Sequence, residues 1–264
     1  MTAVSPDDLL DLAVRSARAA GELLVARFGD AATGIAAKST DTDLVSDADR
    51  EAEALIAGMI RAERPEDALV SEEGAAAAGG SGLRWLVDPL DGTINYLWAI
   101  PQWAVSVACL DDAGGLVGVV HDPVRGETFT AVRGRGARLG DVPLVLTGGV
   151  ELGEVLLGTG FGYDPERRGL QIRRLRAVLP AVRDVRRFGS AAIDLAWVAC
   201  GRLDAFYEAG LNPWDGAAGA LLVREAGGTV EDLPPRDGLP EAILAARPGL
   251  SGRLRALVDA PLPD

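Results

Sequence analysis

The chain has 264 residues and is acidic, with 39 Asp plus Glu against 26 Lys plus Arg and a formal net charge of −13. At ~150 residues per domain, this length indicates one large domain or two smaller ones. The acidic balance excludes a broad surface for nucleic acid or anionic membrane, because such surfaces depend on clustered Lys and Arg. We therefore expect neither nucleic acid nor a membrane among its partners.

The scarcest residue types exclude further classes of site. His121 is the only histidine, so a His-rich zinc site cannot form, and a Ser-His or Cys-His catalytic pair would have to use it. Cys109 and Cys200 fit no metal-binding or redox spacing and indicate a reducing compartment. Lys38 is the only lysine, which makes it either a chance survivor or a candidate for a role that Arg cannot fill.

The first residues carry no targeting signal, since Met1 to Asp11 contain acids and a proline where a basic stretch and an apolar run would be needed. No stretch approaches the ~20 apolar residues of a membrane-spanning helix. We therefore expect a cytoplasmic protein.

Capping signals and helical spacing predict two N-terminal helices. Ser5-Pro6 followed by two acids is typical of a helix start, and the apolar spacing behind it ends at Phe28-Gly29. A second helix is predicted over about 47–64, with Ser46 as its cap. Short apolar runs separated by Gly, Pro or Asp then predict a largely antiparallel sheet. Its predicted strands cover 68–70, 85–87, 103–110, 116–120 and 128–132.

After about residue 146, helices and strands alternate, which favours an α/β second half. The predicted helices cover about 165–179, 190–200, 215–226 and 250–258, and the predicted strands cover 155–157, 204–207 and 242–245. Two glycine-rich stretches, Gly134–Gly140 and Gly158–Gly162, have neither Rossmann nor Walker spacing, and we interpret both as turns. We interpret His121, at a strand end, as structural.

The densest chemical signal is the segment Asp88-Pro-Leu-Asp91-Gly92-Thr93-Ile-Asn95. A strand is predicted to end at Asp88, and a short helix to begin at Gly92-Thr93. Two carboxylates three residues apart on such a turn can face one point, and the N–H groups of the helix start can bind an anion. This combination is typical of a Mg²⁺–phosphate centre. The alternative is an ordinary Asp-Pro and Asp-Gly turn.

Two further acidic segments follow short apolar runs. Glu72-Glu73 comes after a predicted strand, and the alternative there is a solvated loop. Trp214-Asp215-Gly-Ala-Ala-Gly219 begins a predicted helix whose small residues allow close approach to a neighbour. Asp215 can cap that helix and also reach a metal ion, and the alternative is that it only caps.

Together these segments resemble the inositol monophosphatase family of Mg²⁺-dependent, lithium-sensitive phosphatases. The resemblance runs from Lys38 to Gly228, and its segments are Lys38–Asp49, Glu72-Glu73, Asp88–Asn95, Trp214–Gly219 and Glu225–Gly228. The stretches Val155–Tyr163 and Arg186–Asp215 are most similar to bacterial inositol-1-monophosphatases. Two segments depart from the family pattern: 96–101, which includes Trp98, and Asn212-Pro213. Both departures leave open which alcohol the phosphate ester of the substrate contains.

The resemblance implies a role for each site residue. The metal ligands, for two or three Mg²⁺ ions with Asp88 bridging, would be Glu72, Asp88, Asp91, Asp215 and the carbonyl of Leu90. The catalytic set would be Glu72, Thr93, Asp49 and Asp91, with Glu72 and Thr93 orienting the attacking water and Asp49 holding Thr93. The substrate would be bound by the N–H groups of Gly92 and Thr93, by Glu208 and Asp215, and by packing on Ala191. Lys38 would support the metals.

The activity implied by the resemblance is hydrolysis of inositol 1-phosphate by metal-activated water. Mg²⁺ would overcome the repulsion between an anionic ester and an anionic nucleophile. Histidinol phosphate, fructose 1,6-bisphosphate and a nucleotide 3′-phosphate are alternative substrates, and a non-catalytic regulatory protein that contacts the transcription machinery is an alternative class.

The resemblance also implies a layered αβαβα sandwich of the sugar-phosphatase type. We expect an N-terminal α+β domain over 1–145 with most metal ligands, and a C-terminal α/β domain over 146–264 with Asp215 and Glu208. A homodimer is implied as well.

Overall fold

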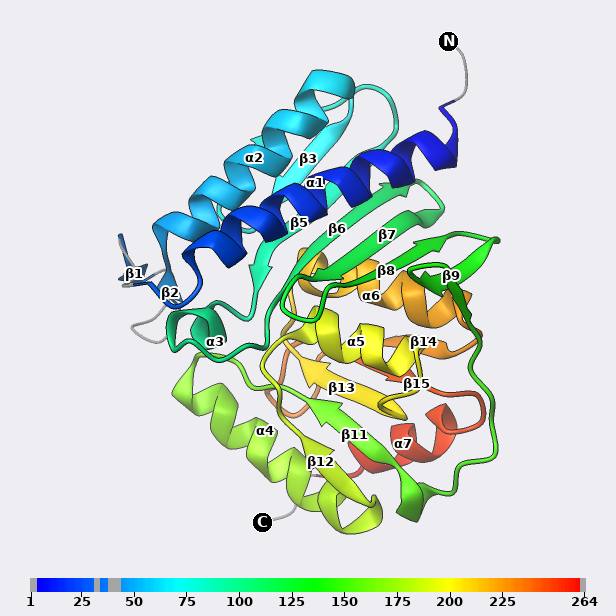
Figure 1. Cartoon of the computed structure of the whole chain (residues 1–264). Helices are drawn as coiled ribbons and strands as arrows, with labels where there is room; N and C mark the ends of the chain where they lie inside the picture. Colours follow the sequence, from blue (N-terminus) through cyan, green and yellow to red (C-terminus); the bar gives the residue numbers. More distant parts are fainter. Residues whose placement is uncertain (1–3, 31–33, 38–43, 262–264) are drawn as a thin grey trace.

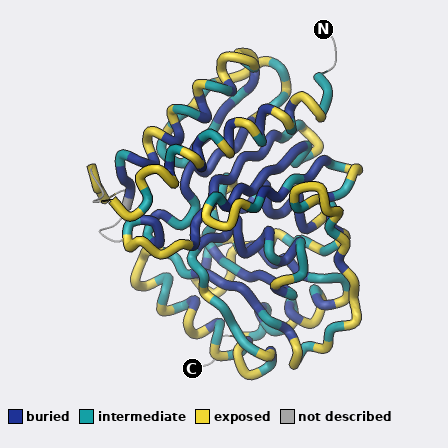
Figure 2. The backbone as a smooth tube through the Cα atoms, viewed as in Figure 1, coloured by how far each residue is buried: buried dark blue, intermediate teal, exposed yellow. Residues whose placement is uncertain are grey.

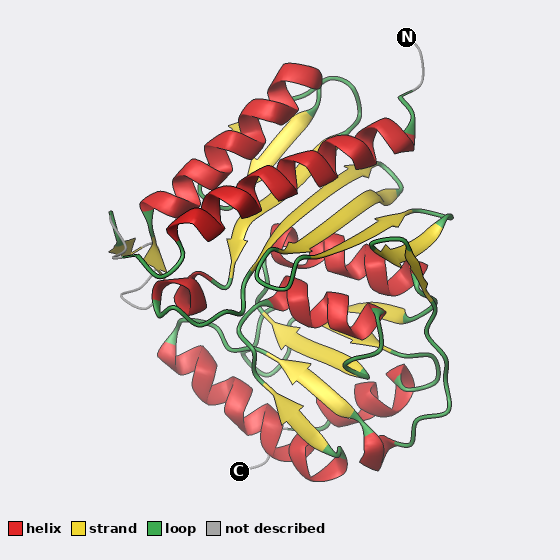
Figure 3. Cartoon of the chain, viewed as in Figure 1, coloured by secondary structure: helices red, strands yellow, loops and turns green. Residues whose placement is uncertain are grey.

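The computed structural model describes residues 4–30, 34–37 and 44–261, and these form five stacked layers of helices and sheets (Figures 1 and 3). The layers are α1 (Pro6–Arg27) with α2 (Asp47–Glu63), an eight-stranded sheet, α5 (Ala191–Ala199) with α6 (Pro213–Glu225), a five-stranded sheet, and α4 (Pro165–Val178) with α7 (Ser251–Val258). The expected αβαβα sandwich is therefore confirmed.

The outer helices α1 and α2 form where local signals predict them. The Ser5 hydroxyl accepts from the N–H of Asp7 at 3.2 Å, and Pro6 occupies the first turn, where its missing N–H costs nothing. Alanine and leucine at helical spacing give α1 one buried face, which includes Leu9, Ala13 and Ala17. That face packs on the eight-stranded sheet.

The eight-stranded sheet has the order β10-β9-β8-β7-β6-β5-β3-β4 and is antiparallel except between β3 and β5. Its strands are β3 (Ala68–Ser71), β4 (Ala76–Ala77), β5 (Arg84–Asp91), β6 (Ala104–Asp111), β7 (Gly114–Asp122), β8 (Glu127–Val132), β9 (Gly136–Leu139) and β10 (Val142–Leu144). A small separate sheet joins β1 (Ala36–Ala37) to β2 (Leu44–Val45).

Two predictions in this region are wrong. We predicted that the strand carrying Asp88 ends there, but β5 continues to Asp91, because its register against β6 shifts between Asp88 and Asp91 and this irregularity accommodates Pro89. We interpreted 134–140 as a turn, but 136–139 pairs with β8 as a strand. Glycines at both ends of this short strand are typical of turns, and for this reason the sequence did not indicate a strand.

The five-stranded sheet has the order β12-β11-β13-β15-β14, in which β12, β11 and β13 are parallel and β15 pairs antiparallel with both β13 and β14. Its strands are β11 (Leu156–Thr159), β12 (Asp184–Arg186), β13 (Ala205–Ala209), β14 (Thr229–Leu233) and β15 (Ala242–Ala246). The sequence analysis missed both edge strands, β12 and β14. Polar and charged residues break their apolar pattern, as is usual where a strand faces solvent.

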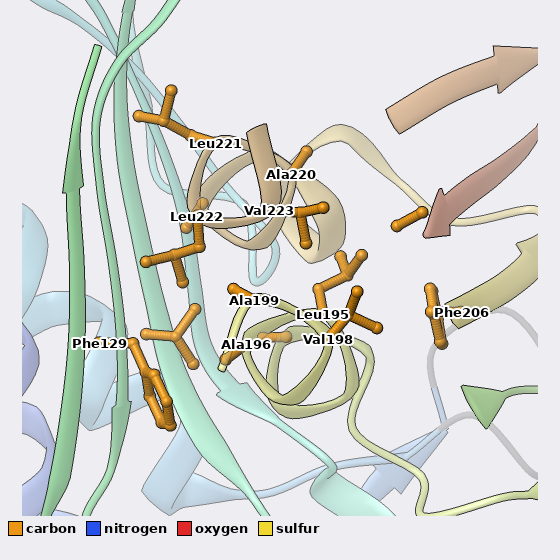
Figure 4. Packing of buried hydrophobic residues seen from close by; sticks show 14 of the residues in the cluster. Phe129, Leu195, Ala196, Val198, Ala199, Phe206, Ala220, Leu221, Leu222 and Val223 are labelled. Atoms are coloured by element: carbon orange, nitrogen blue, oxygen red, sulfur yellow. The ribbon is translucent and has the colours of Figure 1, made fainter. Parts of the chain in front are cut away.

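The central helices α5 and α6 lie between the two sheets, where the backbone is largely buried (Figure 2). Eight of the nine residues of α5 are buried, and a helix that is apolar on all sides belongs in such an interior. Figure 4 shows α5 and α6 packed together, with Leu195 and Val223 among the contact residues. The small residues of α6 allow this approach, because a Cβ on Gly219 would stand 2.4 Å from Leu195 Cβ.

Several motif residues have structural tasks. Glu225 accepts hydrogen bonds from the N–H groups of Gly134 and Gly136, both at 2.8 Å, and so ties α6 to the β8–β9 turn. His121 is buried with Nδ1 3.1 Å from Thr128 Oγ1, which confirms its structural interpretation.

Among the described residues, no helix combines the length and apolar character needed to cross a membrane.

The α5–α6 contact generates a stability prediction. Replacing Gly219 with Ala should lower the free energy of unfolding by about 2 kcal/mol, because overpacking outweighs the ~1 kcal/mol that Ala gains in a helix. Gly58→Ala in α2 is the matched control, since a Cβ there meets no heavy atom within 4 Å. It should be neutral or stabilising in urea unfolding. Equal urea midpoints for Gly219→Ala and Gly58→Ala would contradict the explanation that close helix packing requires glycine at position 219.

Candidate active site

A cavity of about 570 Å³ opens where the two sheets and the central helices meet. The end of β5, the start of α3 (Thr93–Leu97), the first turns of α5 and α6, and the ends of β11 and β13 surround it. Nine residues that the sequence analysis singled out line this cavity: Glu72, Asp88, Leu90, Asp91, Gly92, Thr93, Ala191, Glu208 and Asp215. Asp49 lies behind them against Thr93, and Lys38 lies outside the described residues.

The end of β5 and the start of α3 place the two motif aspartates and Thr93 on the cavity wall. Asp88 Oδ1 accepts from the N–H of Leu90 at 3.0 Å, which orients this carboxylate. Gly92 has φ of 99°, a backbone conformation that favours glycine. A Cβ there would also stand 3.0 Å from the carbonyl oxygen of Gln102, so only glycine fits this position.

Thr93 is held from behind by a buried carboxylate. Its Oγ1 lies 2.9 Å from Asp49 Oδ1 and 3.0 Å from the carbonyl oxygen of Leu90. Asp49 Oδ2 accepts from the N–H of Ser46 at 2.9 Å and is fully buried at the start of α2. Because a hydroxyl has one proton, donation to Asp49 or Leu90 leaves the lone pairs of Thr93 for another partner.

Asp91 joins the first sheet to the central helix layer. Its Oδ2 accepts from Ser190 Oγ at 2.6 Å and from the N–H of Ala192 at 2.7 Å, both at the start of α5. Burial raises the pKa of Asp91 to about 6, although the hydrogen bond from Ser190 favours the charged form. The sequence analysis missed Ser190, whose signal was its place directly before an apolar helical run.

Asp215 has two tasks rather than one. We predicted that it caps its helix, but Asn212 is the N-cap, Pro213 takes the first turn, and Asp215 stands at the third position. Its Oδ2 accepts from the N–H of Asn212 at 2.7 Å. It also lines the cavity, so it fixes the helix start and faces the other acids. The unusual Asn212-Pro213 pair is thus a helix start.

Like charges dominate the electrostatics of this wall. Burial and the charges of Glu72, Asp91 and Asp215 raise the pKa of Asp88 well above its usual range. Burial likewise raises the pKa of Asp215, and the nearby carboxylates add to the effect. Ionised carboxylates held this close together repel one another unless a cation compensates them.

The donor set fits a hard divalent cation. No group of three or more His, Cys, Asp or Glu side chains within the described residues already has the geometry of a metal cage. The acids nevertheless face one cavity, all their donors are oxygen, and their mutual repulsion is what a cation relieves. Mg²⁺ takes such ligands and usually retains waters and substrate oxygens as others.

Glu53 supports the segment that carries Glu72, and the sequence analysis missed it. This buried side chain of α2 accepts from the N–H groups of Glu73 at 2.8 Å and Ala75 at 3.0 Å. The N–H of Glu72 in turn donates to the carbonyl of Val87 at 3.1 Å. The Glu72-Glu73 segment is therefore a fixed turn rather than a solvated loop. A lone glutamate inside a helix gave no signal of this role.

Glu208, Asp194 and Arg187 also line the cavity. Burial raises the pKa of Glu208 to about 8, against the opposing effect of the Arg187 guanidinium. Trp98, in the segment that departs from the family pattern, is 63% exposed and is not among the residues that line the cavity. The chain leaves α3 there through Ala99, which has φ of 53°, and turns outward.

Comparison with known proteins gives consistent results. The model of the inositol monophosphatase family matches residues 5–259. Inositol-1-monophosphatase SuhB of Mycobacterium tuberculosis is 40% identical over 91% of this chain and 88% of its own. Nus factor SuhB of Escherichia coli is 41% identical over 85% of each chain. The crystal structure of extragenic suppressor protein suhB from Bartonella henselae has a TM-score of 0.88 and 37% identity, covering 96% of this chain and 98% of its own.

The repulsion around Asp88 generates a prediction for the metal-free protein. Because the pKa of Asp88 is raised in the folded chain, its ionised form costs stability above the unfolded pKa of about 4. In EDTA at pH 8, Asp88→Asn should therefore raise the Tm by about 2–4 °C. Mg²⁺ should raise the Tm of the unmodified chain more than that of Asp88→Asn.

Asp112→Asn, which removes the same charge at an exposed turn, serves as the control and should follow the unmodified chain in both conditions. Differential scanning fluorimetry measures all three proteins. If the Tm of the unmodified chain does not change when Mg²⁺ is added, the assignment of these acids as metal ligands is wrong.

Proposed function

The chain belongs to the inositol monophosphatase family, and on that premise we propose that it hydrolyses a small phosphate monoester with Mg²⁺ as cofactor, inositol 1-phosphate being the favoured substrate. One observation carries the proposal. Four acids from three segments, Glu72, Asp88, Asp91 and Asp215, face one cavity together with Thr93, whose hydroxyl a buried aspartate holds.

We assign the metal ligands to the four acids and the carbonyl of Leu90, for two or three ions, with Asp88 as the shared ligand. When bound, Mg²⁺ supplies positive charge that neutralises the phosphate, lowers the pKa of an attacking water and stabilises the leaving alkoxide. The hydrogen bonds on Asp91 Oδ2 and Asp215 Oδ2 orient both carboxylates before any ion arrives. This preorganisation lowers the reorganisation needed on binding.

We assign the positioning of the nucleophile to Thr93 and Glu72. The Thr93 hydroxyl donates a hydrogen bond to Asp49 at 2.9 Å, so its oxygen can accept a hydrogen bond from the attacking water. Glu72 offers a second acceptor on the same wall. Two fixed acceptors set the direction of the water's lone pair, and such orientation contributes much of the catalysis in phosphoryl transfer.

We assign the substrate's two ends to opposite walls of the cavity. The N–H groups of Gly92 and Thr93 would bind the phosphate, next to the acids that hold the metals. Glu208 would accept hydroxyl groups of the alcohol, with Asp215 at the boundary, and the small side chain of Ala191 leaves room for a ring. Nothing in this division needs a histidine.

Three related expectations accompany this proposal. We propose a homodimer, a cytoplasmic location, and a domain boundary after residue 145. The strands of the eight-stranded sheet end at Leu144 and those of the five-stranded sheet begin at Leu156, which supports the boundary. The central helices contact both sheets, so the two parts share one interior.

A substrate panel tests the activity. With Mg²⁺, we expect turnover of inositol 1-phosphate to exceed that of histidinol phosphate, fructose 1,6-bisphosphate and a nucleotide 3′-phosphate by at least ~10-fold in kcat/KM, because hydroxyl acceptors reward a neutral polyol. Li⁺ should inhibit. Phosphate release measures each reaction. A tenfold preference for histidinol phosphate would refute the favoured substrate, and inactivity toward every ester would favour the regulatory alternative.

Substitution of a metal ligand tests the assigned chemistry. Asp91→Asn should lower kcat by at least ~100-fold, because one negative charge is lost at the metals. Folding should be nearly unaffected, since an amide oxygen can still accept from Ser190 and Ala192. Steady-state kinetics and thermal unfolding check the two statements, with Asp112→Asn as the control of equal charge. Near-normal turnover of Asp91→Asn would refute this role.

A further inference from the structure

Gly158 lies in β11, and Gly160, directly after that strand, lines the cavity. Gly158 and Gly160 are two residues apart, so in an extended chain their side-chain positions lie on the same face. A Cβ on Gly158 would stand 2.9 Å from Leu203 Cδ1 and 3.3 Å from Phe206 Cδ2, with Asp194 Cγ third at 3.5 Å. A Cβ on Gly160 would stand 2.0 Å from Glu208 Oε2. The Glu208 carboxyl group thus occupies the space that the missing side chain of Gly160 leaves.

These carboxyl groups come from different elements. Glu208 lies on β13, which pairs in parallel with β11, and Asp194 lies in the first turn of α5. Asp194 is 1% exposed, and among the described residues its Oδ1 has no hydrogen-bond partner. Both line the cavity. A buried carboxyl oxygen without a hydrogen-bond partner, close to a second carboxyl group, lowers the stability of the fold, so a functional explanation is needed.

We propose that Gly160 is a specificity-determining residue, because its missing side chain lets the Glu208 carboxylate lie against β11 in position to accept hydroxyls of a neutral polyol, with Asp194 as a positioning residue behind it. This inference rests on the proposed function, since it concerns the alcohol end of the same substrate. Our interpretation of 158–162 as a turn is wrong in its first two residues, because Gly158 and Thr159 lie in β11.

The chemistry of the pair favours a neutral alcohol. When ionised, two acids on one wall repel a second phosphate, which disfavours a bisphosphate substrate. A carboxylate accepts two hydroxyl protons at once, and vicinal hydroxyls of a polyol match its two oxygens. Burial raises the pKa of both acids while Arg187 opposes the shift, so this guanidinium limits the repulsion between them.

Gly160→Ala separates recognition from folding. Gly160 does not have a positive φ, so alanine fits its backbone. The atoms that a Cβ would meet are the end of the Glu208 side chain, which can rotate away. The variant should therefore fold normally and displace only the carboxylate. Gly58→Ala, whose Cβ meets no heavy atom within 4 Å, controls for the change of residue type.

The experiment compares inositol 1-phosphate with phenyl phosphate, which has no hydroxyl on its alcohol side. For Gly160→Ala, we expect kcat/KM on inositol 1-phosphate to fall by about tenfold or more, as for loss of a charged hydrogen bond. On phenyl phosphate it should stay within about twofold. Equal losses on both esters, or no loss on either, would overturn the inference.

A double variant tests whether Gly160 acts through Glu208. Glu208→Gln should by itself lower the ratio of kcat/KM on inositol 1-phosphate to kcat/KM on phenyl phosphate. Adding Gly160→Ala to Glu208→Gln should then change this ratio by less than about twofold. Additive losses would show that Gly160 acts through something else. Asp194→Asn should raise KM for inositol 1-phosphate with kcat nearly unchanged, and leave phenyl phosphate unaffected. A loss of kcat on both esters would overturn its positioning role.

Calorimetric binding of inositol 1-phosphate separates this inference from the proposed function. If the unmodified chain hydrolyses no ester, the proposed function fails, yet a Kd that weakens about tenfold in Gly160→Ala still supports the inference. If the unmodified chain does not bind inositol 1-phosphate, or binds it as tightly as Gly160→Ala does, the inference is wrong.

Discussion

Repulsion between buried carboxylates is the constraint on which the rest of the structure depends. Glu72, Asp88, Asp91 and Asp215 come from segments up to 143 residues apart and face one cavity. Their charges and their burial raise the pKa of Asp88 and of Asp215. Such a cluster persists only where the surrounding fold is stable enough to hold it.

The fold supplies that support through fixed backbone hydrogen bonds and a densely packed interior. Asp91 accepts from the start of α5, Asp215 from the start of α6, and Asp88 from its own turn. Helices α5 and α6, which supply the donors to Asp91 and Asp215, pack closely because residues at their contact are as small as Gly219. Asp91 and Asp215 are therefore tied to the central helices, and a metal ion would meet ligands already in place.

Much of the fold could be predicted because its signals are local. The Ser5 cap and the alanine-rich spacing behind it identify α1, and the apolar runs of β6 and β7 identify a buried sheet. Predictions failed where pairing overrode the local pattern. Strand β5 passes through Pro89 because a register shift against β6 absorbs it, and the polar edge strand β12 exists because β11 offers it a partner.

The sequence by itself determined the chemistry of the site. The acids, their spacing around Asp88 and Asp91, and the scarcity of histidine all point to oxygen-ligand metal chemistry, because side-chain type decides which ions and protons a residue can hold. Only the tertiary structure decided which atoms meet. Ser190 on Asp91, Glu53 behind Glu72 and Asp194 beside Gly158 join residues from distant segments, and contacts of this kind depend on packing that no short stretch of sequence encodes.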